Sequence, residues 1–207
     1  MFVLLTGFEP YGDENFNPSG EIAKRFDGKV INGVKIVGTV VPVSFKRVKP
    51  ILEEKILEVN PSLVISLGLA PRTHYIRIER VAINVMDSGP DNDGYAPRDE
   101  PIVAGGPTAY FSTLPIRGIL KRLISSGIPA AISNSAGTYL CNCVMYLVQH
   151  IIRVNEVKAK AGFIHIPYTA KQSAEKLQST LRGVPPPFIP LTLVERSIEL
   201  AVSESLL

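Results

Sequence analysis

The sequence has no tryptophan, only two cysteines in 207 residues, and no apolar run long enough to cross a lipid bilayer. The cysteines, Cys141 and Cys143, stand one residue apart and do not make the disulfide framework of a small secreted protein. This usage is typical of a reducing compartment. The apolar start, Phe2–Leu5, lacks the basic residues and small-residue cleavage site of a secretory signal. We therefore expect a cytoplasmic protein with no membrane association.

An excess of charge of one sign is also missing. The net charge is +3, and lysine and arginine are scattered without a basic stripe or a block of like charges. Nucleic acid and acidic lipid surfaces are therefore not expected as partners. What is present is a chain that is 45% hydrophobic, long enough to bury a substantial core, and undivided by any repeat or linker. We expect a single domain over residues 1–207.

Predicted strands alternate with predicted helices along the chain. Short runs of apolar or β-branched residues predict strands at residues 2–5, 34–43, 63–67, 130–133 and 162–166. Apolar residues at helical spacing predict helices at about 17–28, 44–60, 113–126, 139–154, 170–180 and 191–206. This alternation predicts a single-domain three-layer α/β/α fold, a mostly parallel twisted sheet flanked by helices. Ligands of such sheets bind beyond the carboxyl ends of the strands.

Two segments do not follow this alternation. Residues 75–85 alternate between apolar and polar side chains, which predicts a strand in an antiparallel or edge pairing. Residues 86–107 show no periodicity and carry turn-forming pairs such as Gly89-Pro90. A loop of this length inside a compact domain is usually functional or mobile.

Two segments resemble ligand-binding motifs but lack residues that those motifs require. Gly7 and Gly12 have the spacing of a phosphate-binding loop, but no lysine follows, and three carboxylates would repel phosphate: Glu9, Asp13 and Glu14. This loop is either a rigid support for Phe8 and Tyr11 as binding walls or an ordinary turn. The acidic residues between 87 and 100 lack the spacing of a calcium loop, so turn formation is the better explanation for them.

The segment from Ser133 to Cys143 indicates a reactive thiol. It leaves a predicted strand, turns at Gly137 and enters a long apolar helix, so Cys141 falls in the first turn of that helix. The unpaired N–H groups and the helix dipole there stabilise a thiolate and can bind an oxyanion. Cys143 lies about 200° around the helix and is expected in the core. The alternative is that both cysteines are core residues.

One histidine stands where it could act on that thiol. His165 lies at the carboxyl end of the last predicted strand, in an apolar run where a polar ring needs a partner. A thiolate is one candidate partner, and a backbone group is the other. Glu79 lies between apolar residues of the 75–85 segment and could orient the imidazole as a third member. It could equally form an ion pair with Arg77 or Arg80.

The chain resembles the pyroglutamyl-peptidase I family, also called pyrrolidone-carboxylate peptidases, over nearly its whole length. The resemblance rests on six landmarks in the expected order: Thr6–Gly12, Ile78–Asn84, Pro90–Gly94, Gly105–Tyr110, Ser135–Asn142 and Gly162–Tyr168. The resemblance implies a cysteine exopeptidase with an α/β sandwich fold. It also implies a homotetramer that uses no metal and no cofactor.

The resemblance also assigns roles to residues of this sequence. It implies a triad of Cys141 as nucleophile, His165 as general base and acid, and Glu79 as the residue that orients the imidazole. The implied substrates are peptides with an amino-terminal pyroglutamate. By motif position, the residues that bind the lactam ring are Phe8, Tyr11, Tyr139 and Leu140 as walls and the backbone near Leu69 as a hydrogen-bond partner.

Two positions depart from the family pattern. Most relatives have phenylalanine in place of Tyr11, and they carry an arginine before the Pro90 segment that is thought to help form the oxyanion site. This chain has Met86–Pro90 there, about one residue shorter and without arginine, so Arg98 or backbone N–H groups would have to substitute. Two alternatives therefore stay open: a related thiol amidase with a different acyl group, or a binding protein with weakened catalysis.

Overall fold

The structure, a computed structural model, describes residues 1–12, 14–180 and 183–207, and it is built around one seven-stranded sheet. In spatial order the strands are β2 (Val30–Ile31), β3 (Val34–Val41), β1 (Phe2–Phe8), β4 (Leu63–Leu69), β9 (Lys160–Ile166), β5 (Ile76–Glu79) and β8 (Ala130–Ser133). Strands β3, β1, β4 and β9 run parallel to one another. Strand β5 runs antiparallel to β9, and β8 runs parallel to β5.

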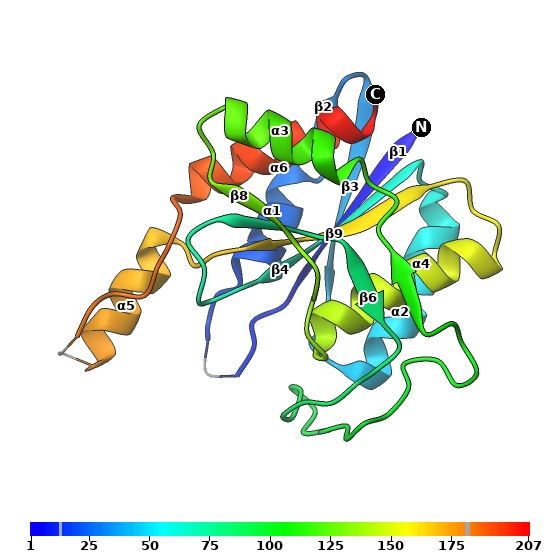
Figure 1. Cartoon of the computed structure of the whole chain (residues 1–207), viewed down its shortest axis with the longest axis horizontal. Coiled ribbons are helices and arrows are strands. Elements are labelled where there is room, and N and C mark those ends of the chain that lie inside the picture. Colours follow the sequence, from blue (N-terminus) through cyan, green and yellow to red (C-terminus); the bar gives the residue numbers. More distant parts are fainter. Residues whose placement is uncertain (13, 181–182) are drawn as a thin grey trace.

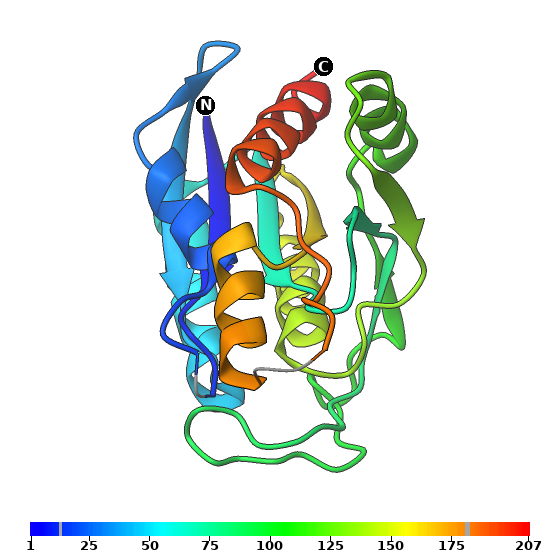
Figure 2. The same cartoon turned by 90° about the vertical axis from the view of Figure 1, so that its left-hand side faces the viewer.

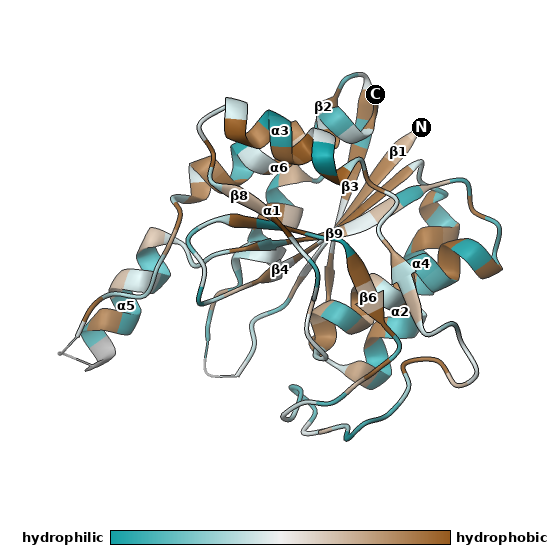
Figure 3. Cartoon of the chain, viewed as in Figure 1, coloured by the Kyte–Doolittle hydropathy of each residue, from teal (hydrophilic) through white to brown (hydrophobic). Residues whose placement is uncertain are grey.

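Helices cover both faces of this sheet (Figures 1 and 2). On one face, α1 (Pro18–Phe26), α3 (Ile116–Ser125) and α6 (Leu191–Ser205) bury an apolar cluster against the strands. On the other, α2 (Phe45–Val59) and α4 (Leu140–Val154) bury a second cluster. Figure 3 shows the hydrophobic colour gathered on the central strands, between the two helix layers. The predicted three-layer α/β/α class is confirmed.

The helix boundaries follow from side chains read in the sequence. Asn17 caps α1 by accepting a hydrogen bond from the Ser19 N–H, and Pro18 occupies the first helical position. Ser44 caps α2 through the Arg47 N–H, and this helix ends at Asn60 in the left-handed conformation. Helix α5 (Ala170–Thr180) projects beyond the body of the sheet, with its label at the left of Figure 1.

Several predicted boundaries were wrong. Strands β1 and β4 continue through Gly7 and Gly68, where the sequence predicts that they end, and stop at Phe8 and Leu69. The segment 75–85 forms two strands, because the chain leaves the main sheet after β5 and pairs as β6 (Val81–Ile83) with β7 (Ala109–Phe111). Arg80 marks the change, since its N–H donates to the Ser133 carbonyl and its carbonyl accepts from the Ser112 N–H. The expected antiparallel pairing is confirmed for β5. The short strands β2 and β7 were not predicted.

The predicted start of α3 was also wrong, because this helix begins at Ile116 and not near Thr113. The Thr113 hydroxyl both accepts from the Ala161 N–H and donates to its carbonyl, so this residue is held against β9 instead of entering the helix. The long segment 86–107 forms no helix and no named strand, as predicted. Its one ladder contact is an isolated bridge between Met86 and Glu100.

Candidate active site

Cys141 occupies the second position of α4, where the chain arrives from β8. The residue before the helix, Tyr139, has an extended backbone, and its side chain accepts no hydrogen bond from the first turn. The N–H groups of that turn are therefore not capped by Tyr139. These groups and the positive end of the helix dipole lie beside the thiol. Cys141 is partly exposed, whereas Cys143 is buried in the core between the sheet and α4. Burial raises the pKa of the Cys143 thiol to about 12, so this thiol stays protonated.

Gly68 allows strand β4 to approach the thiol. A Cβ atom at this position would lie 2.7 Å from the Cys141 Sγ atom and 2.7 Å from the Phe163 ring, which is too close for any side chain. Gly68 also stands opposite His165 in the parallel pairing of β4 and β9. Because Gly68 has no side chain, the Cys141 thiol can pack against β4 at the position that pairs with His165.

His165 and Glu79 form a buried pair beneath the thiol. The His165 Nδ1 atom lies 2.8 Å from Glu79 Oε1, and the two residues are 5% and 0% exposed. Burial by itself lowers the pKa of the imidazole, but the charge and hydrogen bond of Cys141, together with those of Glu79, raise it to about 9. The two neighbours therefore favour the protonated form of the His165 imidazole.

The remaining histidines have other surroundings. His74 is exposed and packs edge-on against Tyr75. The His150 Nδ1 atom lies 3.0 Å from the Tyr110 hydroxyl, on the far part of α4. Of the three, His165 is the one that the fold brings to Cys141.

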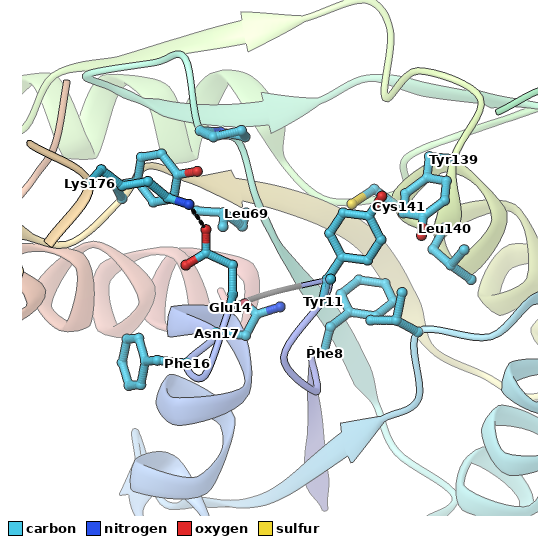
Figure 4. Close-up of a pocket in the computed structure, with 14 residues that line it drawn as sticks. Phe8, Tyr11, Glu14, Phe16, Asn17, Leu69, Tyr139, Leu140, Cys141 and Lys176 are labelled. Atoms are coloured by element: carbon cyan, nitrogen blue, oxygen red, sulfur yellow. Dashed lines mark ion pairs between the residues drawn. The ribbon is translucent and has the colours of Figure 1, made fainter. Parts of the chain in front are cut away.

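A cavity of about 480 Å³ opens beside the thiol (Figure 4). All five residues predicted to bind the ring line it together with Cys141: Phe8, Tyr11, Leu69, Tyr139 and Leu140. The Tyr11 and Tyr139 rings lie 5.4 Å apart, and Tyr139 also packs edge-on against Phe45. The pocket is therefore mostly aromatic and apolar near the sulfur, which suits a flat, weakly polar ring.

The far end of the cavity holds residues that the sequence analysis did not assign to it. Lys176 of α5 forms an ion pair with Glu14, and its amino group lies 5.9 Å from the centre of the Tyr168 ring. Phe16 lines the same end. Tyr168 closes the last sequence landmark and could have been inferred from it. Nothing local in the sequence links Lys176 to Glu14. Asp13, one of the three carboxylates noted in the same loop, lies outside the described residues.

The family profile described as pyroglutamyl peptidase matches residues 1–206. The chain belongs to the pyroglutamyl peptidase family. The pyrrolidone-carboxylate peptidase of Thermococcus litoralis is 48% identical over 99% of this chain and 92% of its own length. That of Pyrococcus furiosus is 47% identical over the whole of both chains, and that of a Bacillus cereus strain is 43% identical over 97% and 90%.

Solved structures agree with this assignment. A variant of the Pyrococcus furiosus pyrrolidone carboxyl peptidase matches with a TM-score of 0.95 at 45% identity, covering 100% of this chain and 98% of that one. The Thermococcus litoralis structure matches with a TM-score of 0.94 at 48% identity, covering 99% and 92%. The family expected from the sequence landmarks is confirmed.

The segment Met86–Pro90, in which the sequence analysis noted no arginine, contacts the turn that leads into α4. The Asp87 N–H donates to the Thr138 carbonyl, and the Thr138 hydroxyl donates to the Asp87 carbonyl. Arg98 is 77% exposed in its side chain, pairs with Asp87 at 3.6 Å and does not line the cavity. Arg98 is therefore not placed at the cavity that Cys141 lines.

The acidic residues of the same loop serve its own conformation. One carboxylate oxygen of Asp91 accepts from the Phe45 N–H, and the other accepts from the N–H groups of Asp93 and Tyr95. This is turn and helix-entry chemistry, in agreement with the sequence analysis. Within the part of the chain that the structure describes, no three His, Cys, Asp or Glu side chains group as a metal site, and no helix has the length and hydropathy to cross a bilayer.

Proposed function

We propose that this protein is a cysteine exopeptidase that removes the amino-terminal pyroglutamyl residue from peptides. The observation that carries the proposal is the contact chain Cys141–His165–Glu79 at the edge of an aromatic cavity. Family membership supports the same activity. The substrates would be peptides whose first residue is a lactam, and no metal or cofactor is required by the chemistry described below.

In the proposed reaction the Cys141 thiolate attacks the pyroglutamyl carbonyl carbon and forms a carbon–sulfur bond. The first-turn N–H groups of α4 stabilise the oxyanion that develops. Protonated His165 donates its proton to the leaving amine as the carbon–nitrogen bond breaks. His165 then takes a proton from water, which attacks the thioester, releases pyroglutamate and restores the thiolate–imidazolium pair. Glu79 holds the imidazole in orientation throughout.

Recognition of the lactam would combine shape with polar contacts. Phe8, Tyr11 and Tyr139 would enclose the flat ring, and the backbone of Leu69, the last residue of β4 and a residue that lines the cavity, would be its hydrogen-bond partner. A pocket that pairs the lactam N–H and C=O disfavours acyl groups lacking them, because its own polar groups would be left unpaired. We therefore expect pyroglutamyl amides to be preferred over prolyl amides.

The test is release of p-nitroaniline from pyroglutamyl-p-nitroanilide. The Cys141→Ser variant should lose activity, whereas Cys143→Ala is the matched control that should keep it. Turnover that survives in Cys141→Ser would overturn the assigned nucleophile. A preference for prolyl or glutamyl anilides would indicate the related thiol amidase, and tight binding without turnover would indicate a binding protein. The resemblance also predicts a homotetramer, which analytical ultracentrifugation measures.

A further inference from the structure

The carboxylate of Glu79 has a second partner that the triad does not require. Arg77 precedes it by two residues on β5, so both side chains point to the same side of the strand. The Arg77 Nη2 atom lies 3.2 Å from Glu79 Oε1, the same oxygen that contacts His165. The ion pair and the triad, weighed as alternatives from the sequence, therefore occur together.

The Arg77 guanidinium also holds the turn that leads to the nucleophile. Its Nη2 atom donates to the Ser133 hydroxyl and to the Ser135 carbonyl, both at 2.8 Å. Ser133 ends β8, and the chain then runs through Ser135 into α4, where Cys141 lies. One guanidinium thus contacts Glu79 and the approach to Cys141.

The surroundings of Glu79 explain why a cation is needed there. Glu79 is completely buried, and its Oε2 atom has no hydrogen-bond partner among the described residues. The charged or titratable groups that contact the carboxylate are His165 from β9 and Arg77 from its own strand, and Cys141 of α4 interacts in turn with His165. Among the described residues, the buried Arg80 Nε atom also lacks a hydrogen-bond partner. Burying a carboxylate that is only partly paired is costly, and a second cation offsets that cost.

We propose that Arg77 is a positioning residue that holds the Glu79 carboxylate in its orientation, so that His165 stays directed at Cys141. This inference rests on the proposed function, in which Glu79 orients His165. Arg77 touches no reacting atom, and it acts through Glu79. Its removal should lower kcat and leave KM nearly unchanged, because the residue does not line the cavity.

The first test is a double-mutant cycle on pyroglutamyl-p-nitroanilide. Arg77→Met should lower kcat by about tenfold or more, and Arg77→Lys should recover part of the loss because it restores the charge. In the Glu79→Gln background, Arg77→Met should change kcat by less than about twofold, since no carboxylate remains to hold. Arg117→Met, which removes an exposed cation of α3, is the matched control. Equal losses in both backgrounds would overturn the proposal and make Arg77 only a clamp on the turn.

A second test does not depend on peptidase activity. Alkylation of Cys141 by iodoacetamide reports the thiolate, and Cys143 is too buried to contribute. At about pH 6, Arg77→Met should slow alkylation by about tenfold, and Ser133→Ala, which removes only a turn contact, should slow it far less. An unchanged or faster rate in Arg77→Met would refute the inference. Wild-type protein that is alkylated in this pattern but cleaves no pyroglutamyl amide would refute the proposed function alone.

Discussion

Substitution of Gly68 by alanine should lower the proposed peptidase activity by displacing the Cys141 thiol. The new methyl carbon would lie 2.7 Å from Cys141 Sγ and 2.7 Å from the Phe163 ring, whereas ordinary contact begins at 3.4 Å. The thiol must therefore move by about 0.7 Å, and misplacement on the order of 1 Å can cost about 10²-fold in rate. The Phe163 ring packs 4.8 Å from the His165 ring, so the imidazole is disturbed as well. We expect kcat/KM to fall by about 30- to 100-fold.

The same substitution also overpacks the core, which costs about 1–3 kcal/mol of stability. Gly162→Ala is the control for that effect. Gly162 lies on β9, and a methyl group there would overlap the Ser112 hydroxyl and come within 2.7 Å of Leu114, away from the cavity. Both variants should lower the melting temperature by several degrees. Only Gly68→Ala should lose activity toward pyroglutamyl-p-nitroanilide. A folded Gly68→Ala enzyme with activity within about threefold of wild type, or an equal loss in Gly162→Ala, would refute the reasoning.

Three further predictions follow from the burial and charge of single side chains. Cys143→Ala should keep full activity and lose about 1–2 kcal/mol of unfolding free energy, measured by urea denaturation. The pKa of His165 is about 9 in the folded state and about 6.5 in the unfolded state. Protonation of this residue should therefore stabilise the fold by up to about 3 kcal/mol below about pH 6.5. This contribution should be lost as the pH rises through about 9. Urea denaturation across this pH range should show the unfolding free energy of the wild-type protein falling, and falling less in Cys141→Ser. An equal fall in both proteins would mean that Cys141 does not stabilise the protonated form of His165. Arg98→Ala should change kcat/KM by less than about twofold because Arg98 is exposed and outside the cavity, and a tenfold loss would instead place it at the oxyanion.

The local elements of this fold could be predicted because their signals are local. Asn17 and Ser44 cap the helices that they precede, and short apolar runs mark the central strands β1, β4 and β9. The position of Cys141 in a first helical turn needs only the strand–turn–helix pattern around it. The position of His165 at a strand end needs only the length of the apolar run before it.

The sheet order could not be predicted, because it depends on pairings between distant segments. Strand β5 lies between β9 and β8 and runs against β9, and this arrangement places Glu79 at His165. The sequence left open whether Glu79 interacts with His165 or forms an ion pair with Arg77, and it could not show that both residues contact the same carboxylate oxygen. The break at Arg80, where the chain changes sheets, has no local signal either.

The amino-acid sequence by itself therefore determined which side chains could do chemistry, through periodicity, capping residues and motif order. The tertiary structure decided which of them meet. Gly68 matters because its missing side chain leaves room for the Cys141 sulfur, and Lys176 matters because α5 carries it to Glu14 across the cavity. Contacts between residues this far apart in the chain arise from close packing of the whole core, which no local pattern specifies.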